Sequence, residues 1–287
     1  MPSGQSGEPR PAVSKAPYDQ LYIYEIAGDA RAHTRGLGAS FLGLWLEGDT
    51  SFVFCSAPAD EAVQRLLAAA GLVLRQRHHL SYEQWQGGLD LEPLAVGDLW
   101  IAPAWDPAPA PPGRRRLALD PGLVFGSGLH PTTRHCLDLL WLRRQAGPLG
   151  RVLDLGCGTG ILALAAAAWG ASEVIAVDQN PLCVATTQNN ARLNGLAVAV
   201  REGPAAEFLD RPAGVVLANL HYQVQQGLWS RPRDLAGYPD LILSGVMRSQ
   251  KGPLEDLLLS RGYAILERRE AEFTWFSLWA RRICYKT

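Results

Sequence analysis

Three glycines and two aspartates are the residues of this sequence whose types and spacing suit a chemical role. Gly156, Gly158 and Gly160 form a G-x-G-x-G turn, with Asp154 shortly before it and Asp178 at the end of the next predicted strand. Glycine allows a tight turn and a close approach to a ligand, and the first N–H groups of a following helix favour electron-rich groups. A carboxylate at the end of the next strand can reach ribose hydroxyls. The pattern therefore predicts a nucleoside-cofactor site.

The spacing of the glycines indicates which cofactor this is. Dinucleotide-binding folds use G-x-G-x-x-G, whereas glycine stands at alternate positions here. This arrangement is similar to motif I of the S-adenosylmethionine-dependent methyltransferases, and we assign Asp154, Gly156, Gly158 and Asp178 to the cofactor site. A nicotinamide dehydrogenase stays open as the alternative enzyme, and a tight turn without a ligand is the simplest alternative.

A second unusual segment, residues 119–133, precedes the turn. It is too rich in glycine for a strand and too apolar for a solvated loop, so we expect a lid over the turn, with Phe125 at the cofactor. Pro131 suits the first turn of a helix, where Thr133 can satisfy free N–H groups. His130 has the chemistry of a general base, but a capping or positioning role at the helix start fits its place equally well.

Asn219 is the candidate residue nearest to the reacting atoms. It follows a predicted strand at residues 215–218, and the loops at the carboxyl ends of a parallel sheet carry the ligands. Its side-chain carbonyl suits an amine, which would donate a hydrogen bond to it. A cap on the next helix is the alternative role.

Alternating strands and helices must position these residues. The pattern predicts an α/β fold with a doubly wound, mostly parallel, seven-stranded Rossmann-like sheet. The predicted strands are residues 152–155, 173–177, 198–201, 215–218, 241–244, 263–266 and 273–285, and helices are predicted at 161–168, 181–194 and 249–260. The last two strands should form an antiparallel edge pair, with Trp275 and Trp279 in the core.

The first part of the chain predicts a separate, smaller α+β domain. Residues 1–17 are rich in Pro, Ser and Gly and indicate a disordered leader. Residues 18–100 should form a substrate-recognition domain, with a hairpin across Gly48 and a helix over 60–70. Prolines within 101–118 predict a linker without regular structure that lets the domains reorient. The catalytic domain then covers residues 119–287.

Composition narrows the class of protein. A net charge of −1 gives no global attraction to nucleic acid, and 47% hydrophobic residues suffice for a core. The N-terminal segment lacks the apolar run of a signal peptide or membrane span. Five cysteines without a C-x-x-C pair favour neither disulfides nor metal binding. We expect a cytoplasmic protein with no metal and no stable nucleic-acid or membrane binding, and we favour a monomer.

Three motifs resemble the bacterial PrmA-type methyltransferases, which modify amino groups of large-subunit ribosomal protein eleven. They are Asp120-Pro-Gly-Leu-Val-Phe-Gly-Ser-Gly-Leu-His-Pro-Thr-Thr133, Leu153-Asp-Leu-Gly-Cys-Gly-Thr-Gly160 and Ala218-Asn-Leu220. The resemblance covers residues 82–285 well and the first 80 residues only loosely. It implies S-adenosylmethionine as the cofactor, with contacts from Thr133, Gly156, Asp178 and Asn219.

The expected reaction is methyl transfer to amino groups, either Lys side chains or the N-terminus, of a ribosomal protein. Such an in-line transfer requires positioning and water exclusion more than acid or base catalysis. We therefore expect Asn219 to orient the amine as the catalytic residue. Another protein or a small-molecule amine remains the alternative substrate, because the N-terminal domain is weakly matched, and a NAD-dependent dehydrogenase is a more distant alternative.

Overall fold

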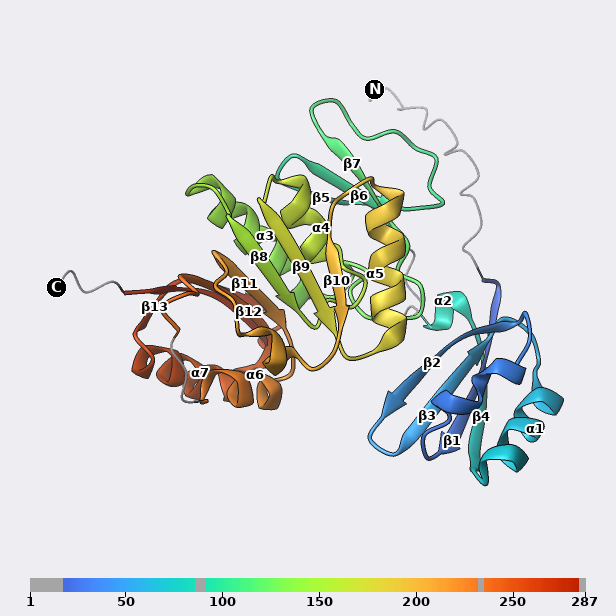
Figure 1. The fold of residues 1–287 in the computed structure, drawn as a ribbon. Helices are drawn as coiled ribbons and strands as arrows, with labels where there is room; N and C mark the ends of the chain where they lie inside the picture. The colour runs from blue at the N-terminus through green and yellow to red at the C-terminus, as the bar shows by residue number, and fades with distance from the viewer. Residues whose placement is uncertain (1–17, 86–90, 232–234, 284–287) are drawn as a thin grey trace, which may run out of the picture.

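The computed structural model describes residues 18–85, 91–231 and 235–283. Their strands are arranged in three sheets, which Figure 1 shows with a central sheet, a separate N-terminal sheet and a short sheet beside α4 and α5. The leader predicted over residues 1–17 lies outside the described residues.

The central sheet has the strand order β10-β9-β8-β11-β12-β14-β13. Its strands are β8 (Arg151–Leu155), β9 (Glu173–Asp178), β10 (Ala199–Glu202), β11 (Val215–Asn219), β12 (Asp240–Met247), β13 (Tyr263–Ala271) and β14 (Trp275–Arg282). Strands β8 to β12 run parallel, whereas β14 pairs antiparallel with β12 and β13 with β14. The predicted doubly wound sheet and its antiparallel edge pair are confirmed. The strand order reverses between β8 and β11, where such sheets bind ligands.

Helices cover both faces of this sheet because its strands are apolar on both sides. On β8, Val152 packs into one buried cluster with α3 and α4, and Leu153 and Leu155 pack into another with α6 and α7. Successive side chains of a strand point to opposite faces, which accounts for this division (Figure 1). The helices are α3 (Pro131–Gln145), α4 (Ile161–Ala168), α5 (Pro181–Leu193), α6 (Tyr222–Trp229), α7 (Arg248–Ser260) and a short 3-10 helix η2 (Ala205–Phe208).

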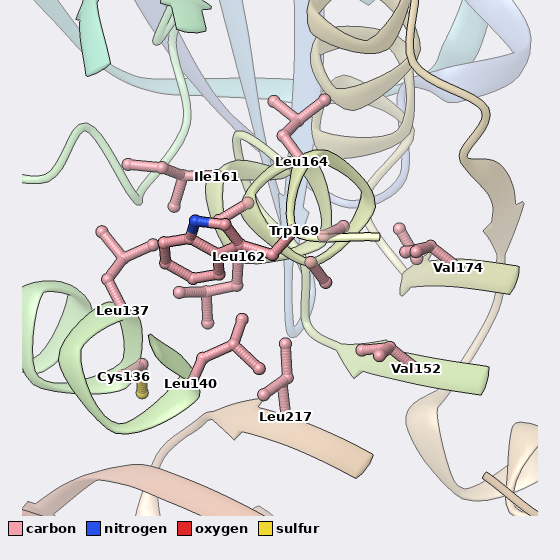
Figure 2. Close-up of a cluster of buried hydrophobic side chains, with 14 of the residues drawn as sticks. Cys136, Leu137, Leu140, Val152, Ile161, Leu162, Leu164, Trp169, Val174 and Leu217 are labelled. Atoms are coloured by element: carbon pink, nitrogen blue, oxygen red, sulfur yellow. The ribbon is translucent and has the colours of Figure 1, made fainter. Parts of the chain in front are cut away.

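Trp169 anchors the larger of the two clusters. Figure 2 shows its indole among Leu137 and Leu140 of α3 and Leu162 of α4, and only 3% of its surface is exposed. Its Nε1 donates a hydrogen bond to Asp98 Oδ1 at 2.7 Å. The helix that follows the glycine turn is therefore fixed to the sheet by packing and to an earlier segment by a hydrogen bond.

The N-terminal domain contains an antiparallel sheet with the order β2-β3-β1-β4. The predicted hairpin joins β2 to β3, and the predicted helix begins at Asp60, directly after its N-cap residue Ala59. The elements are β1 (Gln20–Ala27), η1 (Arg31–Gly36), β2 (Phe41–Glu47), β3 (Thr50–Cys55), α1 (Asp60–Ala70), β4 (Val73–Ser81) and α2 (Tyr82–Trp85).

The prediction that residues 101–118 lack regular structure is wrong at both ends of this segment, where residues 101–103 and 115–118 belong to strands. Strands β5 (Leu94–Val96), β6 (Leu99–Pro103) and β7 (Arg115–Leu119) form a sheet in which β6 and β7 run parallel. Its apolar side chains join the cluster of α3 and α4. The prolines after residue 103 lie in the loop between β6 and β7, so they interrupt the segment without preventing its two ends from pairing.

The N-terminal domain also contacts the catalytic domain directly. Leu182 of α5 belongs to a cluster with Leu21, Phe54 and Tyr82. A Cβ added to Gly43 of β2 would overlap the Leu182 side chain. The hydroxyl of Tyr82 donates a hydrogen bond to the carbonyl of Gly122 at 2.7 Å, across to the predicted lid. Apolar packing and this bond connect the two domains in addition to the chain itself.

Candidate active site

The glycine turn connects β8 to α4 at the carboxyl end of the sheet. Gly156, Gly158 and Gly160 have φ angles of +74°, +54° and +81°, a region that side-chain-bearing residues rarely adopt. The N–H groups of Gly156 and Cys157 both donate to the carbonyl of Val177, at 2.8 and 3.0 Å. These bonds hold the turn against the end of β9, where Asp178 lies.

Asp178 connects the turn to the start of α5. Its Oδ2 accepts a hydrogen bond from the Gly158 N–H at 3.1 Å, and its Oδ1 accepts one from the Asn180 N–H at 2.9 Å. A carboxylate can accept more than one hydrogen bond at each oxygen. Asp178 therefore organises the turn and still has acceptor capacity for the hydroxyls of a ligand.

The lid was predicted over residues 119–133, and the part of it between β7 and α3, residues 120–130 (the lid loop), lies against the glycine turn. The Phe125 carbonyl accepts a bond from the Thr159 N–H at 3.0 Å, and the Gly126 carbonyl accepts one from Thr159 Oγ1 at 2.7 Å. A Cβ on Gly158 would overlap the Phe125 carbonyl, so Gly158 must lack a side chain for the loop to approach. The Phe125 ring itself is 57% exposed.

The start of α3 brings His130 and Thr133 toward Asn219. His130 is the N-cap, and its Nδ1 accepts a bond from the Thr132 N–H at 3.3 Å. Burial lowers the pKa of the His130 imidazole below its ordinary value, so the ring is neutral at neutral pH. Asn219 Nδ2 donates to Thr133 Oγ1 at 3.4 Å, an arrangement that leaves Asn219 Oδ1 to accept a bond from an amine. The N-cap of α6 is His221, not Asn219.

Gln225 of α6 holds the segment that carries Asn219. Its side chain is fully buried, and its Nε2 lies 3.2 Å from the carbonyl of Ala218, 3.3 Å from that of Leu220 and 2.6 Å from that of Ser244. The backbone on both sides of Asn219 is thereby fixed. No local pattern in the sequence distinguishes Gln225, because the burial of a helical glutamine depends on how its helix packs in the fold.

One cavity of about 590 Å³ joins most of these groups, a volume typical of small-molecule sites. Phe125, Gly156, Gly158, Asp178 and Asn219 all line it, as predicted site residues. The other lining residues are Trp45, His130, Thr132, Val177, Gln179, Cys183, Gly203, Pro204, Ala205, Ala206, Leu220, His221, Val224, Gly227, Leu228, Arg231, Gly245 and Trp275.

Two predicted cofactor residues lie behind the cavity wall. Thr133 is 1% exposed and contacts Asn219, while Asp154 is 1% exposed and accepts a bond from the Ala163 N–H of α4 at 3.1 Å. Burial raises the pKa of the Asp154 carboxyl to about 7. Neither residue lines the cavity, so both are placed to support the residues that do.

Two tryptophans at the cavity were not predicted as site residues. Trp275 was expected in the core with Trp279, but Trp275 lines the cavity and its ring meets His130 edge-on at 4.8 Å, whereas Trp279 is buried. Trp45 comes from β2 of the N-terminal domain. No local pattern distinguishes these tryptophans from core residues, since their position at the cavity depends on how the sheet edge and the domains pack.

Within the ranges that the structure covers, no helix has the length and apolar character to cross a membrane. In the same ranges, no group of three or more His, Cys, Asp or Glu side chains is arranged to hold a metal ion.

The chain matches a family model described as ribosomal protein L11 methyltransferase (PrmA) over residues 71–283, well over half of its length. The chain belongs to the PrmA family. The members are S-adenosylmethionine-dependent methyltransferases. The match begins near β4, so β1, β2, β3 and α1 of the N-terminal domain precede it.

Individual relatives agree with this assignment. A ribosomal protein L11 methyltransferase from Marinobacter nauticus is 38% identical over 202 residues, which cover 67% of this chain and 64% of that relative. The Deinococcus radiodurans enzyme of the same name is 32% identical over 71% of this chain and 80% of its own. The crystal structure of the ribosomal protein L11 methylase from Lactobacillus delbrueckii subsp. bulgaricus superposes with a TM-score of 0.58 at 29% identity, covering 65% of this chain and 96% of that one. The matches to the Marinobacter relative and to one from Geobacter metallireducens span 64% and 66% of those proteins.

Proposed function

We propose that this chain is an S-adenosylmethionine-dependent methyltransferase that modifies amino groups, on Lys side chains or the N-terminus, of ribosomal protein L11. One observation carries the proposal: within a chain of the PrmA family, a single cavity joins the glycine turn and Asp178 to Asn219. The relatives described above bear the name of this activity.

The residues at the glycine end of the cavity fit the cofactor. Asp178 has acceptor capacity left for ribose hydroxyls, and Gly156 and Gly158 of the turn line the cavity. Phe125 covers the site from the lid. Asp154 and Thr133 act from behind by fixing α4 and Asn219. S-adenosylmethionine supplies an electrophilic methyl group to this site.

The acceptor end of the cavity suits an amine. A lysine amine has an ordinary pKa of about 10.4 and is charged at neutral pH, yet only its neutral form can attack. Apolar surroundings such as Trp275 and Leu220 lower the pKa of an enclosed amine by desolvation. Asn219 orients the neutral amine through its side-chain oxygen, so positioning replaces a dedicated base.

The N-terminal domain would present the protein substrate. Trp45 of β2 lines the same cavity as Asn219, which supports a role of this domain in presenting the acceptor. The net charge of −1 supplies no general attraction to nucleic acid. We infer a protein rather than a nucleic-acid substrate, and the cytoplasm, where ribosomes are assembled, as the compartment.

The proposal is tested with ribosomal proteins stripped from cells that lack this enzyme. The purified chain and methyl-labelled S-adenosylmethionine are added, and the labelled species is identified by mass. We expect the label on L11, at amino groups, with Asn219→Ala as the inactive control. Label found only on ribosomal RNA or on small molecules would refute the proposal that L11 is the substrate. If calorimetric titration showed that the chain binds NAD and not S-adenosylmethionine, methyl transfer as the reaction class would be refuted.

A further inference from the structure

Asn190 of α5 is fully buried, and its side chain connects three parts of the catalytic domain. Its Oδ1 accepts a hydrogen bond from the Asp120 N–H at 2.9 Å. Its Nδ2 donates to the Asp120 carbonyl at 2.8 Å and to the Thr159 carbonyl at 2.9 Å. One amide thus connects α5 to the first residue of the lid loop and to the glycine turn.

Thr159 makes the second connection between the same two segments. Its N–H and hydroxyl donate to the carbonyls of Phe125 and Gly126. The middle of the lid loop is therefore bonded to Thr159 of the glycine turn, and the first residue of the lid loop, Asp120, is connected to the turn through Asn190. Phe125 and Gly158, which lie next to these bonds, both line the cavity.

We infer that Asn190 is a positioning residue that holds the lid loop and the glycine turn in one fixed arrangement and so sets the affinity for the methyl donor. The inference rests on the proposed function for the identity of that ligand. An apolar side chain of similar size would fill the same space. It would leave the N–H and carbonyl of Asp120 and the carbonyl of Thr159 without this partner, at a cost that packing cannot offset.

Asn194 provides a matched control on the same helix. Its Oδ1 accepts a bond from the Ala118 N–H at 2.8 Å, and its Nδ2 donates to the Ala118 carbonyl at 2.7 Å. Asn194 is half-buried, and its Nδ2 also donates to the Asn190 carbonyl at 2.8 Å. The residue type and the paired bonds to one backbone position are the same as at Asn190, but these bonds reach β7 and not the glycine turn. Loss of a bond between α5 and residues 118–120 would therefore affect both variants, whereas loss of the bond to Thr159 would affect Asn190 alone.

The experiment compares Asn190→Asp with Asn194→Asp in the full-length protein by calorimetric titration with S-adenosylmethionine. At about pH 8 the introduced side chain would be a carboxylate, which has no N–H to donate. It would therefore lose the hydrogen bonds to the Asp120 and Thr159 carbonyls and place a negative charge beside both oxygens. We expect Asn190→Asp to weaken binding at least about tenfold, the effect of losing one or two buried hydrogen bonds. Asn194→Asp should stay within about threefold of the wild type, because the Asn194 side chain bonds Ala118 and the Asn190 carbonyl and none of the residues that line the cavity.

The pH dependence distinguishes positioning from general loss of stability. Burial raises the pKa of the introduced carboxyl, and below that pKa the protonated acid donates a hydrogen bond again. The gap in affinity between Asn190→Asp and the wild type should therefore narrow as the pH falls from about 8 to about 5.5. Equal weakening by both variants, or wild-type affinity in folded Asn190→Asp, would overturn the inference.

Two further controls keep the test decisive. Should Asn190→Asp fail to fold, the uncharged Asn190→Ala replaces it, and wild-type affinity in that variant overturns the inference, whereas weakened affinity supports it. Donor binding is measured without L11, so a wild type that binds S-adenosylmethionine but leaves L11 unmodified refutes the proposed function and not the role of Asn190.

Discussion

At the scale of single residues, Asp178 has a structural role beside the ligand contact that its position predicts. The position after β9 predicts a contact with ribose hydroxyls. In the structure the same carboxylate accepts hydrogen bonds from the N–H groups of Gly158 and Asn180. Its loss would therefore affect a ligand directly and also through the shape of the turn.

Asp178→Ala should weaken S-adenosylmethionine binding by about 1.5–3 kcal/mol, the range for a charge-assisted hydrogen bond. Asp178→Asn is the matched variant, because it keeps one oxygen acceptor and should lose less. Isothermal titration measures both. An Asp178→Ala protein that is folded and binds the donor with unchanged affinity would remove Asp178 from the site.

Asp154 should make stability depend on pH in a defined direction. Burial raises the pKa of its carboxyl from 3.8 to about 7, so between these values the folded protein holds a proton that the unfolded chain releases. The contribution of Asp154 to stability is therefore complete below about pH 4, falls as the pH rises toward 7 and levels off above it. Asp154→Asn removes this dependence. The free energy of unfolding of both proteins is measured with urea from about pH 5 to about pH 8, and that of Asp154→Asn should increase relative to that of the wild type as the pH rises. A constant difference between the two proteins over this range would contradict the prediction.

At the scale of elements, locally encoded features were predicted and long-range pairings were not. The strand, turn and helix around Gly156 and the start of α3 at Pro131 are confirmed because turn chemistry and capping are local. Strands β6 and β7 were missed because each is short and their parallel pairing bridges a proline-rich loop. Trp45 and Gln225 were missed for a similar reason, since only tertiary packing brings them to the site.

The pairing of β7 changes the expected outcome of limited proteolysis. A flexible linker would be cut by trypsin after Arg114, Arg115 or Arg116. In the structure Arg115 forms an ion pair with Asp98 at 2.8 Å and donates to the carbonyl of Ala168, and Leu117 is buried in the core. We expect these sites to be protected in the native protein, as followed by mass analysis of the fragments. Rapid cleavage there would restore the linker interpretation.

At the scale of the whole molecule, the catalytic domain begins earlier than the motifs suggested. The prediction placed its start at residue 119, but Leu99, Ile101 and Leu117 pack in one cluster with α3 and α4. The N-terminal domain contacts this unit in two ways. Leu182 of α5 packs against its apolar cluster, and its Tyr82 donates a hydrogen bond to the carbonyl of Gly122. We therefore propose that the boundary between the N-terminal domain and the catalytic domain falls before β5.

Two truncations test this boundary. A chain that starts at residue 91 keeps β5, β6 and β7 and should bind S-adenosylmethionine within about tenfold of the full protein while losing L11 methylation. A chain that starts at residue 101 loses β5 and the first two residues of β6, Leu99 and Trp100, and the exposed apolar face of α3 should make it unstable. Circular dichroism and calorimetry follow both chains. Equal behaviour of the two would contradict the assigned boundary.

Residue-resolved mass spectrometry of purified L11, after incubation with this enzyme and S-adenosylmethionine, tests the central claim most directly. We predict added methyl groups on lysine or N-terminal amines of L11 with the wild type. A folded Asn219→Ala variant that still binds the donor should add none, because the amine is no longer oriented. Unmodified L11 with an enzyme that binds S-adenosylmethionine, or full methylation by Asn219→Ala, would contradict the account.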